Sequence, residues 1–254
     1  DMKRLENKSA AITGGAGAIG KPTAKQFHDE GAKVLLVDLD EDALKSTVDD
    51  LDNNHVHYAV ADVSNEDDVK NYANEAKKHF GHVDVFFNNA GVEGVVKPIA
   101  DYPVDEFDKL MGVNVRGAWL GMKYMIPLMK EGGSIVISSS VAGMRGTANV
   151  SAYVASKHAL VGIMRTAALE LAGKQIRVNT INPSPVDNRM MRSLEKGFSP
   201  DESEEAKSQF EQMIPLGRYA SNQDIAGLVT FLAGDESRFI TGTINPVDGG
   251  MTAS

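Results

Sequence analysis

The sequence contains no cysteine among its 254 residues. This absence excludes a thiol nucleophile, a zinc ion held by thiolates and any disulfide bond. It fits a reducing compartment, so we expect a cytoplasmic protein. Residues 1–6 carry no apolar stretch of the kind that targets a chain for export.

Long apolar runs and an excess of positive charge are also missing. No run approaches the roughly 20 residues that a membrane-spanning helix needs. The formal net charge is −9, which opposes unspecific attraction to nucleic acid or to anionic lipid. We therefore expect no nucleic-acid partner and no membrane partner. The hydrophobic share of 42% and the charged share of 24% are those of an ordinary soluble protein.

Short apolar segments alternate with longer amphipathic ones, and no repeat or linker divides residues 1–254. The short segments are apolar on both faces and rich in β-branched residues, as buried parallel strands are. Predicted strands cover 9–13, 33–37, 56–60, 83–87, 133–138, 176–181 and 243–246. Predicted helices cover 19–30, 41–51, 66–80, 104–129, 152–172 and 222–234. This alternation predicts one domain with an α/β doubly wound (Rossmann) fold, in which helices cover both faces of a mostly parallel seven-stranded sheet.

One long segment, residues 182–215, shows no strand pattern. It contains four prolines, two adjacent methionines and an acidic run at 201–205. A connection of this length without a strand is usually functional or mobile. We expect an irregular, mobile lid that closes over substrate, with the apolar side chains of Met190, Met191, Leu194 and Phe198 covering the pocket.

The turn after the first predicted strand is rich in glycine and opens the first predicted helix. It reads Gly14, Gly15, Ala16, Gly17, Ala18, Ile19 and Gly20. Glycine lets the backbone turn tightly and approach a pyrophosphate, and the helix that follows offers its free N–H groups to that anion. A flexible turn without a ligand has the same composition. Its place between a buried strand and a helix favours a dinucleotide site, with cofactor contacts from Gly14 and residues 16–20.

The second predicted strand leads into Asp38 and Leu39. A carboxylate at this point accepts hydrogen bonds from the adenosine ribose and repels a 2′-phosphate. The glycine turn contains no Arg or Lys that would neutralise such a phosphate, so the sequence favours NAD over NADP, with contacts from both residues. The alternative is that Asp38 is an ordinary turn residue. Asp40 is better placed to cap the next helix, which leaves Asp38 free.

These residues form part of a wider pattern. Thr13, Gly14, Ala18, Ile19 and Gly20 have the spacing of the cofactor motif in the short-chain dehydrogenase/reductase family, which the chain resembles over nearly its whole length. Six further family marks follow in order: Asp62-Val63, Asn88-Asn89-Ala90-Gly91, Asn114, Ser140, Tyr153-x-x-x-Lys157 and Asp248-Gly249-Gly250. A lone Tyr-x-x-x-Lys arises by chance in many helices, but six ordered marks at family spacing do not.

The resemblance implies roles for named residues. Further cofactor contacts are expected from Asp62, Val63, Asn89, Ala90, Gly91, Tyr153, Lys157, Pro183, Val186 and Asn188. Ser140 is expected to hold the substrate oxygen, and Lys157 to bind the nicotinamide ribose. Asn114 is expected at a helix kink that holds a water between Lys157 and solvent. Members of the family assemble with 222 symmetry, so we expect a homotetramer.

Three positions depart from the family pattern. Ala18 replaces a glycine where the helix packs near the cofactor, a change that we expect to be tolerated. Ser184 replaces another glycine, and Asn188 stands where a threonine often contacts the nicotinamide carboxamide. The Asn188 amide can still donate and accept hydrogen bonds. The region from 182 to 217 is similar to the levodione reductase and cyclohexanol dehydrogenase branch.

The chemistry follows from one helix face. Tyr153 and Lys157 are four residues apart, so a helix presents both side chains together. A free phenol has a pKa near 10, too high for a base at neutral pH. We expect the Lys157 ammonium to lower the pKa of Tyr153, which would then act as the acid/base. Singly, Tyr153, Lys157, Ser140 and Asn114 each fit an ordinary structural role, but jointly they indicate a catalytic set.

Two other kinds of site, a serine hydrolase and a metal centre, have weaker support in the sequence. The run Ser138–Ser140 raises a serine hydrolase, but no Gly-x-Ser-x-Gly motif is present. His158 points about 100° around the helix from Lys157, so it cannot serve as the activating base. Two histidine pairs, His55 with His57 and His79 with His82, have no evident third ligand for a metal ion. We therefore expect no metal site. The histidines are expected to be solvated surface side chains.

The leading prediction is an oxidoreductase that transfers a hydride between NAD(H) and a secondary alcohol or ketone. Three loops are expected to line the substrate pocket: Val92, Glu93 and Gly94; Met144, Asn149 and Val150; and residues 184–191. Their apolar character and the charge of Glu93 favour an uncharged small-molecule substrate, cyclic ones included. An epimerase or dehydratase would need a second substrate domain. The alternative from another class is a non-catalytic dinucleotide sensor or scaffold on the same fold, which a rate measurement with NADH distinguishes.

Overall fold

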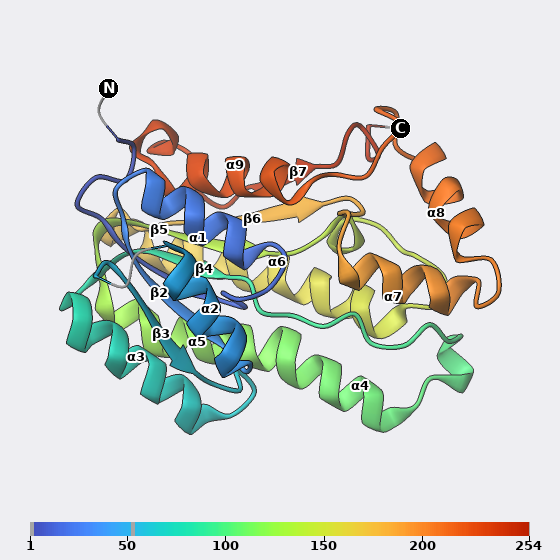
Figure 1. Ribbon diagram of the computed structural model, residues 1–254, viewed down its shortest axis with the longest axis horizontal. Coiled ribbons are helices and arrows are strands. Elements are labelled where there is room, and N and C mark those ends of the chain that lie inside the picture. Colours follow the sequence, from blue (N-terminus) through green and yellow to red (C-terminus); the bar gives the residue numbers. More distant parts are fainter. Residues whose placement is uncertain (1–2, 52–53, 254) are drawn as a thin grey trace.

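The computed structural model describes residues 3–51 and 54–253, and its centre is a seven-stranded sheet (Figure 1). The strands are β1 (Ser9–Thr13), β2 (Lys33–Asp38), β3 (Val56–Val60), β4 (Val83–Asn88), β5 (Met129–Ser138), β6 (Arg177–Pro183) and β7 (Ile244–Val247). Their order is β3-β2-β1-β4-β5-β6-β7, and every neighbouring pair is parallel. The predicted doubly wound fold is confirmed.

Helices cover both faces of the sheet. They are α1 (Gly20–Asp29), α2 (Glu41–Leu51), α3 (Glu66–Phe80), α4 (Val104–Met111), α5 (Ala118–Met125), α6 (Ser151–Leu171), α7 (Arg189–Phe198), α8 (Ser203–Gln212) and α9 (Asn222–Ala233). One apolar core lies under α1, α2 and α9, and the other under α3, α5 and α6. Along β1, Ala10 and Ile12 face the first core and Ala11 faces the second, because successive strand residues point to opposite faces. This explains why the strands are apolar on both sides.

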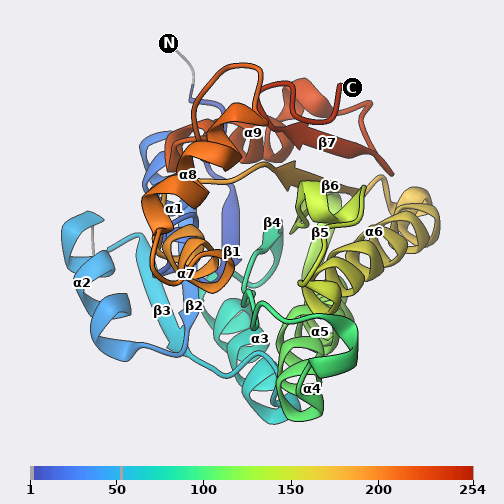
Figure 2. The ribbon, with the colours of Figure 1, turned by 90° about the vertical axis from the view of Figure 1, so that its right-hand side faces the viewer.

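The sheet creates a binding position by its topology. The chain runs outward from β1 to β3 and then returns to place β4 on the other side of β1. The loops after β1 and β4 therefore diverge at the carboxyl ends of the strands, where open α/β sheets bind ligands. Figure 2 looks onto these carboxyl ends, with α7 and α8 standing in front of the sheet.

The prediction of one continuous helix over residues 104–129 is wrong. It divides into α4, a π-helical turn at Gly112–Gly117, α5 and a short 3-10 turn, and Met129 already belongs to β5. The π turn places Asn114 with its side chain buried toward the loop after β4. At the end of this turn, a Cβ on Gly117 would lie 2.9 Å from Cγ2 of Val63. The irregularity expected at Asn114 is thus a widened turn, a feature common at functional sites.

The expectation of an irregular segment at 182–215 is also wrong. Its first two residues end β6, and most of the rest forms α7 and α8. A small apolar cluster of Val141, Met191, Ile214, Tyr219 and Met251 lies beneath these helices. The prolines at 200 and 215 lie outside both helices, where the lack of an N–H costs nothing. The segment is an ordered helical pair that packs beside the carboxyl ends of the strands.

The part of the chain that the structure describes contains no helix long and apolar enough to cross a membrane. Asp1 and Met2, the first two residues of the N-terminal segment 1–6, lie outside the described residues.

Candidate active site

A cavity of about 1280 Å³ opens at the carboxyl ends of the strands. Its lining comes from the segments that follow the strands β1 to β7 and from α7 and α8. One end is bordered by the glycine turn and the end of β2, and the other by the residues after β5 and by α7. The cavity therefore spans the position where the strand order reverses, with room for a dinucleotide and a second small molecule.

The glycine turn is shaped by close backbone contacts. Gly14 has φ +64°, and a Cβ there would lie 3.0 Å from Nδ2 of Asn89 and 3.1 Å from Cα of Ala90. A Cβ on Gly20 would collide with the carbonyl of Gly14. Glycine is thus required at both positions, although only Gly14 lines the cavity. Gly20 serves the packing of the turn against α1.

The ends of β1 and β4 are fastened together beneath this turn. The Thr13 hydroxyl oxygen accepts from the backbone N–H groups of Asn89 and Ala90, at 2.9 and 3.1 Å. The Asn89 amide in turn donates to the carbonyl of Thr13 at 3.2 Å. These bonds fix the loop Asn89-Ala90-Gly91 along the cavity floor, where all three residues line it.

Asp38 lies at the end of β2 and carries two backbone contacts. Its Oδ2 accepts from the N–H of Ala16 at 3.1 Å and its Oδ1 from the N–H of Leu39 at 2.8 Å. Asp40 caps α2 by accepting from the N–H of Ala43 at 3.0 Å, as expected. Asp38 therefore braces the glycine turn as well as lining the cavity.

The charge at this end of the cavity fits one kind of dinucleotide. Asp38, Asp40 and Asp62 line it, while no Lys or Arg among the described lining residues lies in this part of the sequence. The carboxylates here can accept hydrogen bonds from the free hydroxyls of an adenosine ribose. The residues present thus fit NAD.

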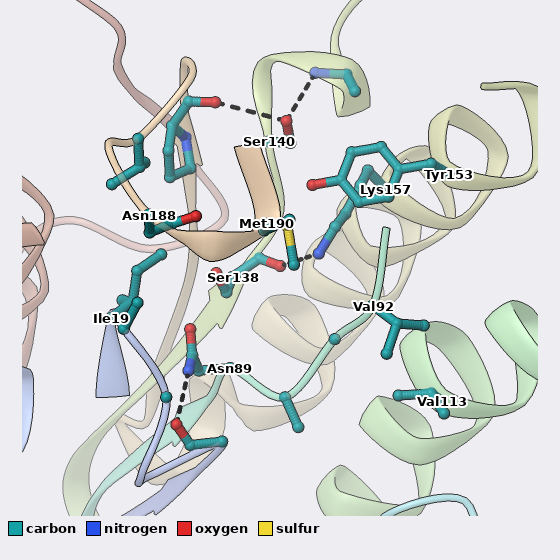
Figure 3. Close-up of a pocket in the computed structure, with 18 of the residues that line it drawn as sticks. Ile19, Asn89, Val92, Val113, Ser138, Ser140, Tyr153, Lys157, Asn188 and Met190 are labelled. Atoms are coloured by element: carbon teal, nitrogen blue, oxygen red, sulfur yellow. Dashed lines mark hydrogen bonds between the residues drawn. The ribbon is translucent and has the colours of Figure 1, made fainter. Parts of the chain in front are cut away.

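Tyr153, Lys157 and Ser140 meet at the other end of the cavity (Figure 3). The buried Lys157 amine donates to the carbonyl of Ser138 at 3.0 Å and lies 5.4 Å from the Tyr153 ring centroid. The Ser140 hydroxyl accepts from the N–H of Ala142 at 3.1 Å. Figure 3 shows the Tyr153 hydroxyl pointing from α6 into the cavity below Ser140. The spacing predicted from sequence is confirmed as a spatial cluster.

Asn114 lies behind this cluster and does not line the cavity. Its Oδ1 accepts from the N–H of Val92 at 2.8 Å, and its Nδ2 donates to the carbonyl of Val92 at 2.9 Å and to the hydroxyl of Ser156 at 3.1 Å. Ser156 in turn donates to the carbonyl of Tyr153 at 2.8 Å. Asn114 therefore holds the loop after β4 against α6. Lys157 donates to the carbonyl of Ser138, and the water expected between Lys157 and solvent at Asn114 stays a prediction.

The prediction that Lys157 lowers the pKa of Tyr153 is wrong when only the protein's own groups are considered. Burial raises the pKa of Tyr153 to about 12, although the contact with Ser140 acts to lower it and the charge of Glu93 raises it further. Burial also lowers the pKa of Lys157 to about 8. The ammonium lies over the ring face rather than at the hydroxyl, and the low polarity around both groups disfavours both charges. The protein alone thus keeps Tyr153 protonated at neutral pH.

Comparisons with known proteins agree with this geometry. Residues 14–252 match a family model described as enoyl-(acyl carrier protein) reductase. Levodione reductase from Leifsonia aquatica is 36% identical over 99% of this chain and 96% of its own, and a crystal structure of levodione reductase matches with TM-score 0.95 at 37% identity, covering 99% of this chain and 100% of that one. The chain belongs to the short-chain dehydrogenase/reductase family.

Two further members of the family give the range of chemistry. A crystal structure of xylitol dehydrogenase with bound NAD⁺ matches with TM-score 0.91 at 34% identity, covering 98% of this chain and 100% of that one. Meso-2,3-butanediol dehydrogenase from Serratia marcescens is 34% identical over 99% of this chain and 97% of its own. The similarity extends over the whole length in both cases, and the predicted family is confirmed.

Most of the family residues predicted from sequence lie around the one cavity. Those that line it are Gly14, Ala16, Gly17, Ala18, Ile19, Asp38, Leu39, Asp62, Val63, Asn89, Ala90, Gly91, Ser140, Tyr153, Lys157, Pro183, Val186 and Asn188. Gly20 and Asn114 do not. Asn188 departs from its expected role in one respect, because its Oδ1 accepts from the N–H of Met191 at 3.3 Å and so caps α7. Its side-chain oxygen is therefore already engaged.

The predicted substrate pocket needs correction. Val92, Val150, Ser184 and most of the residues up to Met191 line the cavity, but Glu93, Gly94, Met144 and Asn149 do not. Glu93 is buried and paired with Arg189. The argument that its charge repels anionic substrates therefore fails, because the carboxylate lies outside the cavity lining and is paired with Arg189.

Sequence reasoning missed a few residues of the site. Phe210 of α8 and Met213, just after that helix, line the cavity although no prediction named them. The methionine and phenylalanine spacing was a signal, but the helices that carry it were not predicted. Ser156 and Ser138 act through a hydroxyl and a backbone carbonyl, and neither role leaves a mark in a single sequence.

The histidines do not form a metal site among the described residues. The His57 and His79 rings stack with centroids 3.8 Å apart, and burial lowers the pKa of His57. The expectation of solvated surface side chains is wrong for His57, which is partly buried between β3 and α3.

Proposed function

We propose that the chain oxidises secondary alcohols with NAD⁺ and reduces the matching ketones with NADH, with Tyr153 as the acid/base. The chain is an NAD-dependent oxidoreductase acting on alcohols and ketones. One observation supports the finer proposal: Tyr153 and Ser140 face the same cavity that Asp38 and the glycine turn border at its other end. A substrate carbon between the two ends lies within reach of both the cofactor and a proton donor.

Each residue of the cluster has a separate task in this proposal. The bound NAD supplies the hydride acceptor or donor. Tyr153 removes or returns the hydroxyl proton, and Ser140 holds the substrate oxygen by a hydrogen bond. Lys157 serves the nicotinamide ribose and contributes positive charge near the phenol. Asn114 holds Val92 and α6 in register, and thereby positions the other three.

The cofactor contacts are proposed from the cavity lining. The glycine turn residues 14 and 16–19 serve the pyrophosphate, while Asp38, Leu39, Asp62 and Val63 serve the adenosine half. Asn89, Ala90 and Gly91 border the nicotinamide ribose, and Pro183, Val186 and Asn188 border the nicotinamide.

We expect an uncharged substrate with an apolar body, cyclic ketones included. The cavity beyond Tyr153 is walled by apolar side chains of the two lid helices, namely Met190, Met191, Leu194, Phe198 and Phe210. A panel of secondary alcohols with NAD⁺ and of ketones with NADH, read at the NADH absorbance, tests the proposal. Turnover on bulky neutral members is expected. Binding of NADH without turnover on any member would favour the dinucleotide sensor instead.

Helices α7 and α8 are proposed to act as a lid that closes over bound substrate. Their apolar side chains face the cavity, while Glu204 and Glu205 on α8 are exposed. Amide hydrogen exchange across residues 182–215 should slow when NADH and an unreactive substrate analogue bind together. The same measurement on α3 provides the internal reference. Unchanged exchange in the ternary complex would remove the lid.

We also propose a cytoplasmic homotetramer. An apolar groove lies on α4, α5 and α6, lined by Met111, Val115, Trp119, Ala159 and Ile163 among others, and the Trp119 side chain is half exposed. A second copy of the chain would cover this face. Sedimentation velocity measures the assembly directly, and a purely monomeric enzyme would contradict it.

A further inference from the structure

A buried carboxylate lies in the loop after β4, outside the catalytic cluster. The Glu93 side chain is only 10% exposed, and its Oε1 lies 3.2 Å from NH1 of Arg189. Arg189 is the first residue of α7, and its side chain is 77% exposed. The ion pair joins two segments 96 residues apart. Because an unpaired carboxylate in a buried position is costly, the pair favours the arrangement in which α7 lies against this loop.

The loop that carries Glu93 is fixed on its other side to the catalytic helix. Asn114 bonds both backbone groups of the adjacent Val92, and it also donates to Ser156. Ser156 donates to the carbonyl of Tyr153. The loop that carries Glu93 is therefore tied through Asn114 and Ser156 to the helix that carries the acid/base.

A second contact joins the same loop to the end of α7. A Cβ on Gly197 would lie 2.6 Å from Cγ2 of Val96, so the loop and the helix approach closely there. The neighbouring Lys97 donates its N–H to the carbonyl of Asn149 at 2.7 Å. Helix α7 thus meets the loop near both of its ends, at Arg189 and at Gly197, and the loop is anchored at Val92 and Lys97, on either side of these contacts.

The charge of Glu93 reaches the acid/base. Among the described residues, it is the one charged group that acts on the pKa of Tyr153, which it raises. Glu93 does not line the cavity, whose charged lining side chains are Asp38, Asp40, Asp62, Asp108, Lys109, Arg145, Lys157 and Arg189. Of these, Lys157 lies over the Tyr153 ring, and Arg189 is the partner of Glu93. The electrostatic potential at the Tyr153 hydroxyl therefore depends on how far Arg189 offsets the charge of Glu93.

We propose that Glu93 and Arg189 form a clasp that docks α7 on the loop after β4 and sets the negative charge felt by Tyr153. Glu93 is a positioning residue, since the catalytic contacts belong to Tyr153 and Ser140. With α7 docked, the guanidinium offsets part of the carboxylate's charge. With α7 lifted, the carboxylate stands uncompensated and favours the protonated phenol. The clasp thereby links closure of α7 to proton transfer, and this inference rests on the proposed role of Tyr153.

The two halves of the clasp should change the pH profile of alcohol oxidation in opposite directions. Glu93→Gln removes the negative charge and keeps a hydrogen-bonding side chain, so the phenolate forms more readily and the rising limb of kcat/KM should move to lower pH. Arg189→Gln leaves Glu93 uncompensated, so the same limb should move to higher pH. Each shift should be roughly 0.3–1 pH unit, the size that one charge exerts at medium range in a partly hydrated site.

A control variant, NADH affinity and a double variant distinguish the clasp from other roles of Glu93 and Arg189. Lys196→Gln removes one positive charge from the exposed face of the same helix and should leave the profile unchanged. NADH affinity, measured by fluorescence titration, should remain within about twofold of wild type in all three variants, because neither clasp residue is assigned to the cofactor. The Glu93→Gln/Arg189→Gln double variant should follow Glu93→Gln, since Arg189 acts only through Glu93.

Several outcomes would overturn the clasp. Shifts of the same sign, or none, in the two single variants would mean that the pair merely supports the fold. A large loss of NADH affinity in Arg189→Gln would assign that residue to the cofactor. Because Arg189 is exposed, its variant should fold even if Glu93→Gln does not. Tyr153→Phe distinguishes the two proposals: if that variant is inactive and the profiles do not shift, the clasp fails and the proposed function stands.

Discussion

Replacing Tyr153 by phenylalanine should lower kcat for alcohol oxidation by at least the roughly 10²–10⁴-fold that general acid–base catalysis contributes. The change removes the hydroxyl that faces the cavity beside Ser140 and keeps the ring that packs near Lys157. The cofactor contacts of the glycine turn, Asp38 and Lys157 remain. NADH should therefore still bind, as a fluorescence titration will show, while steady-state turnover collapses in both directions of the reaction.

Tyr58→Phe is the matched control for this variant. Tyr58 lies on β3, and its hydroxyl donates to Glu41 at 3.4 Å. Removing that hydroxyl should leave both turnover and NADH affinity near the wild-type values. If Tyr153→Phe also kept near-native turnover on a good substrate, another group would have to carry the proton, and the role assigned to Tyr153 would be wrong although the fold is right.

The pH dependence of the wild-type enzyme has a definite sign. Oxidation needs the phenolate, so its rate should rise as the pH increases through the pKa of Tyr153, while ketone reduction needs the phenol and should fall over the same range. The chain's own groups raise this pKa to about 12. The positive nicotinamide of NAD⁺ acts in the opposite direction, so the limb for oxidation should lie below the free phenol value near 10. The protein alone favours the protonated phenol, which suits the reductive direction near neutral pH.

The core of the fold was predictable because its signals are local. The strands are short, apolar on both faces and flanked by amphipathic helices, and Ala10, Ala11 and Ile12 of β1 show why, since each faces one of two cores. The spacing of Tyr153 and Lys157 is likewise fixed by one helix. The resemblance to the family then placed Ser140 and Asp38 at the same cavity, although they belong to distant parts of the chain.

Features that depend on long-range contacts were not predictable. Residues 182–215 contain prolines and an acidic run, and their helices are held by contacts from elsewhere. The buried Glu195 of α7 accepts from the Tyr219 hydroxyl at 2.8 Å, 24 residues along the chain. Asn114 finds its partners 22 and 42 residues away, and this bonding accompanies the π turn that divides the helix. The pKa of Tyr153 is set by burial, which a spacing of four residues does not reveal.

The wild-type enzyme should prefer NAD(H) over NADP(H) on the order of 10²-fold or more in kcat/KM, since placing like charges against each other costs several kcal/mol. The 2′-phosphate of NADP(H) would meet Asp38 at a cavity end that also contains Asp40 and Asp62. Equal or better use of NADP(H) by the wild-type enzyme would refute this assignment.

Two substitutions at Asp38 should separate its charge from its bond to the glycine turn. Asp38→Asn removes the charge and keeps an oxygen that can accept from the N–H of Ala16, so the preference should shrink to within roughly tenfold while NADH affinity is largely kept. Asp38→Ala removes both, so the preference should shrink and the affinity for NADH should also fall, because the turn loses its brace. Asp42→Asn, on the exposed first turn of α2, removes the same charge nearby and should leave the preference unchanged. If Asp38→Asn kept the full preference for NAD(H), the discrimination would arise from the shape of the cavity end rather than from the charge of Asp38.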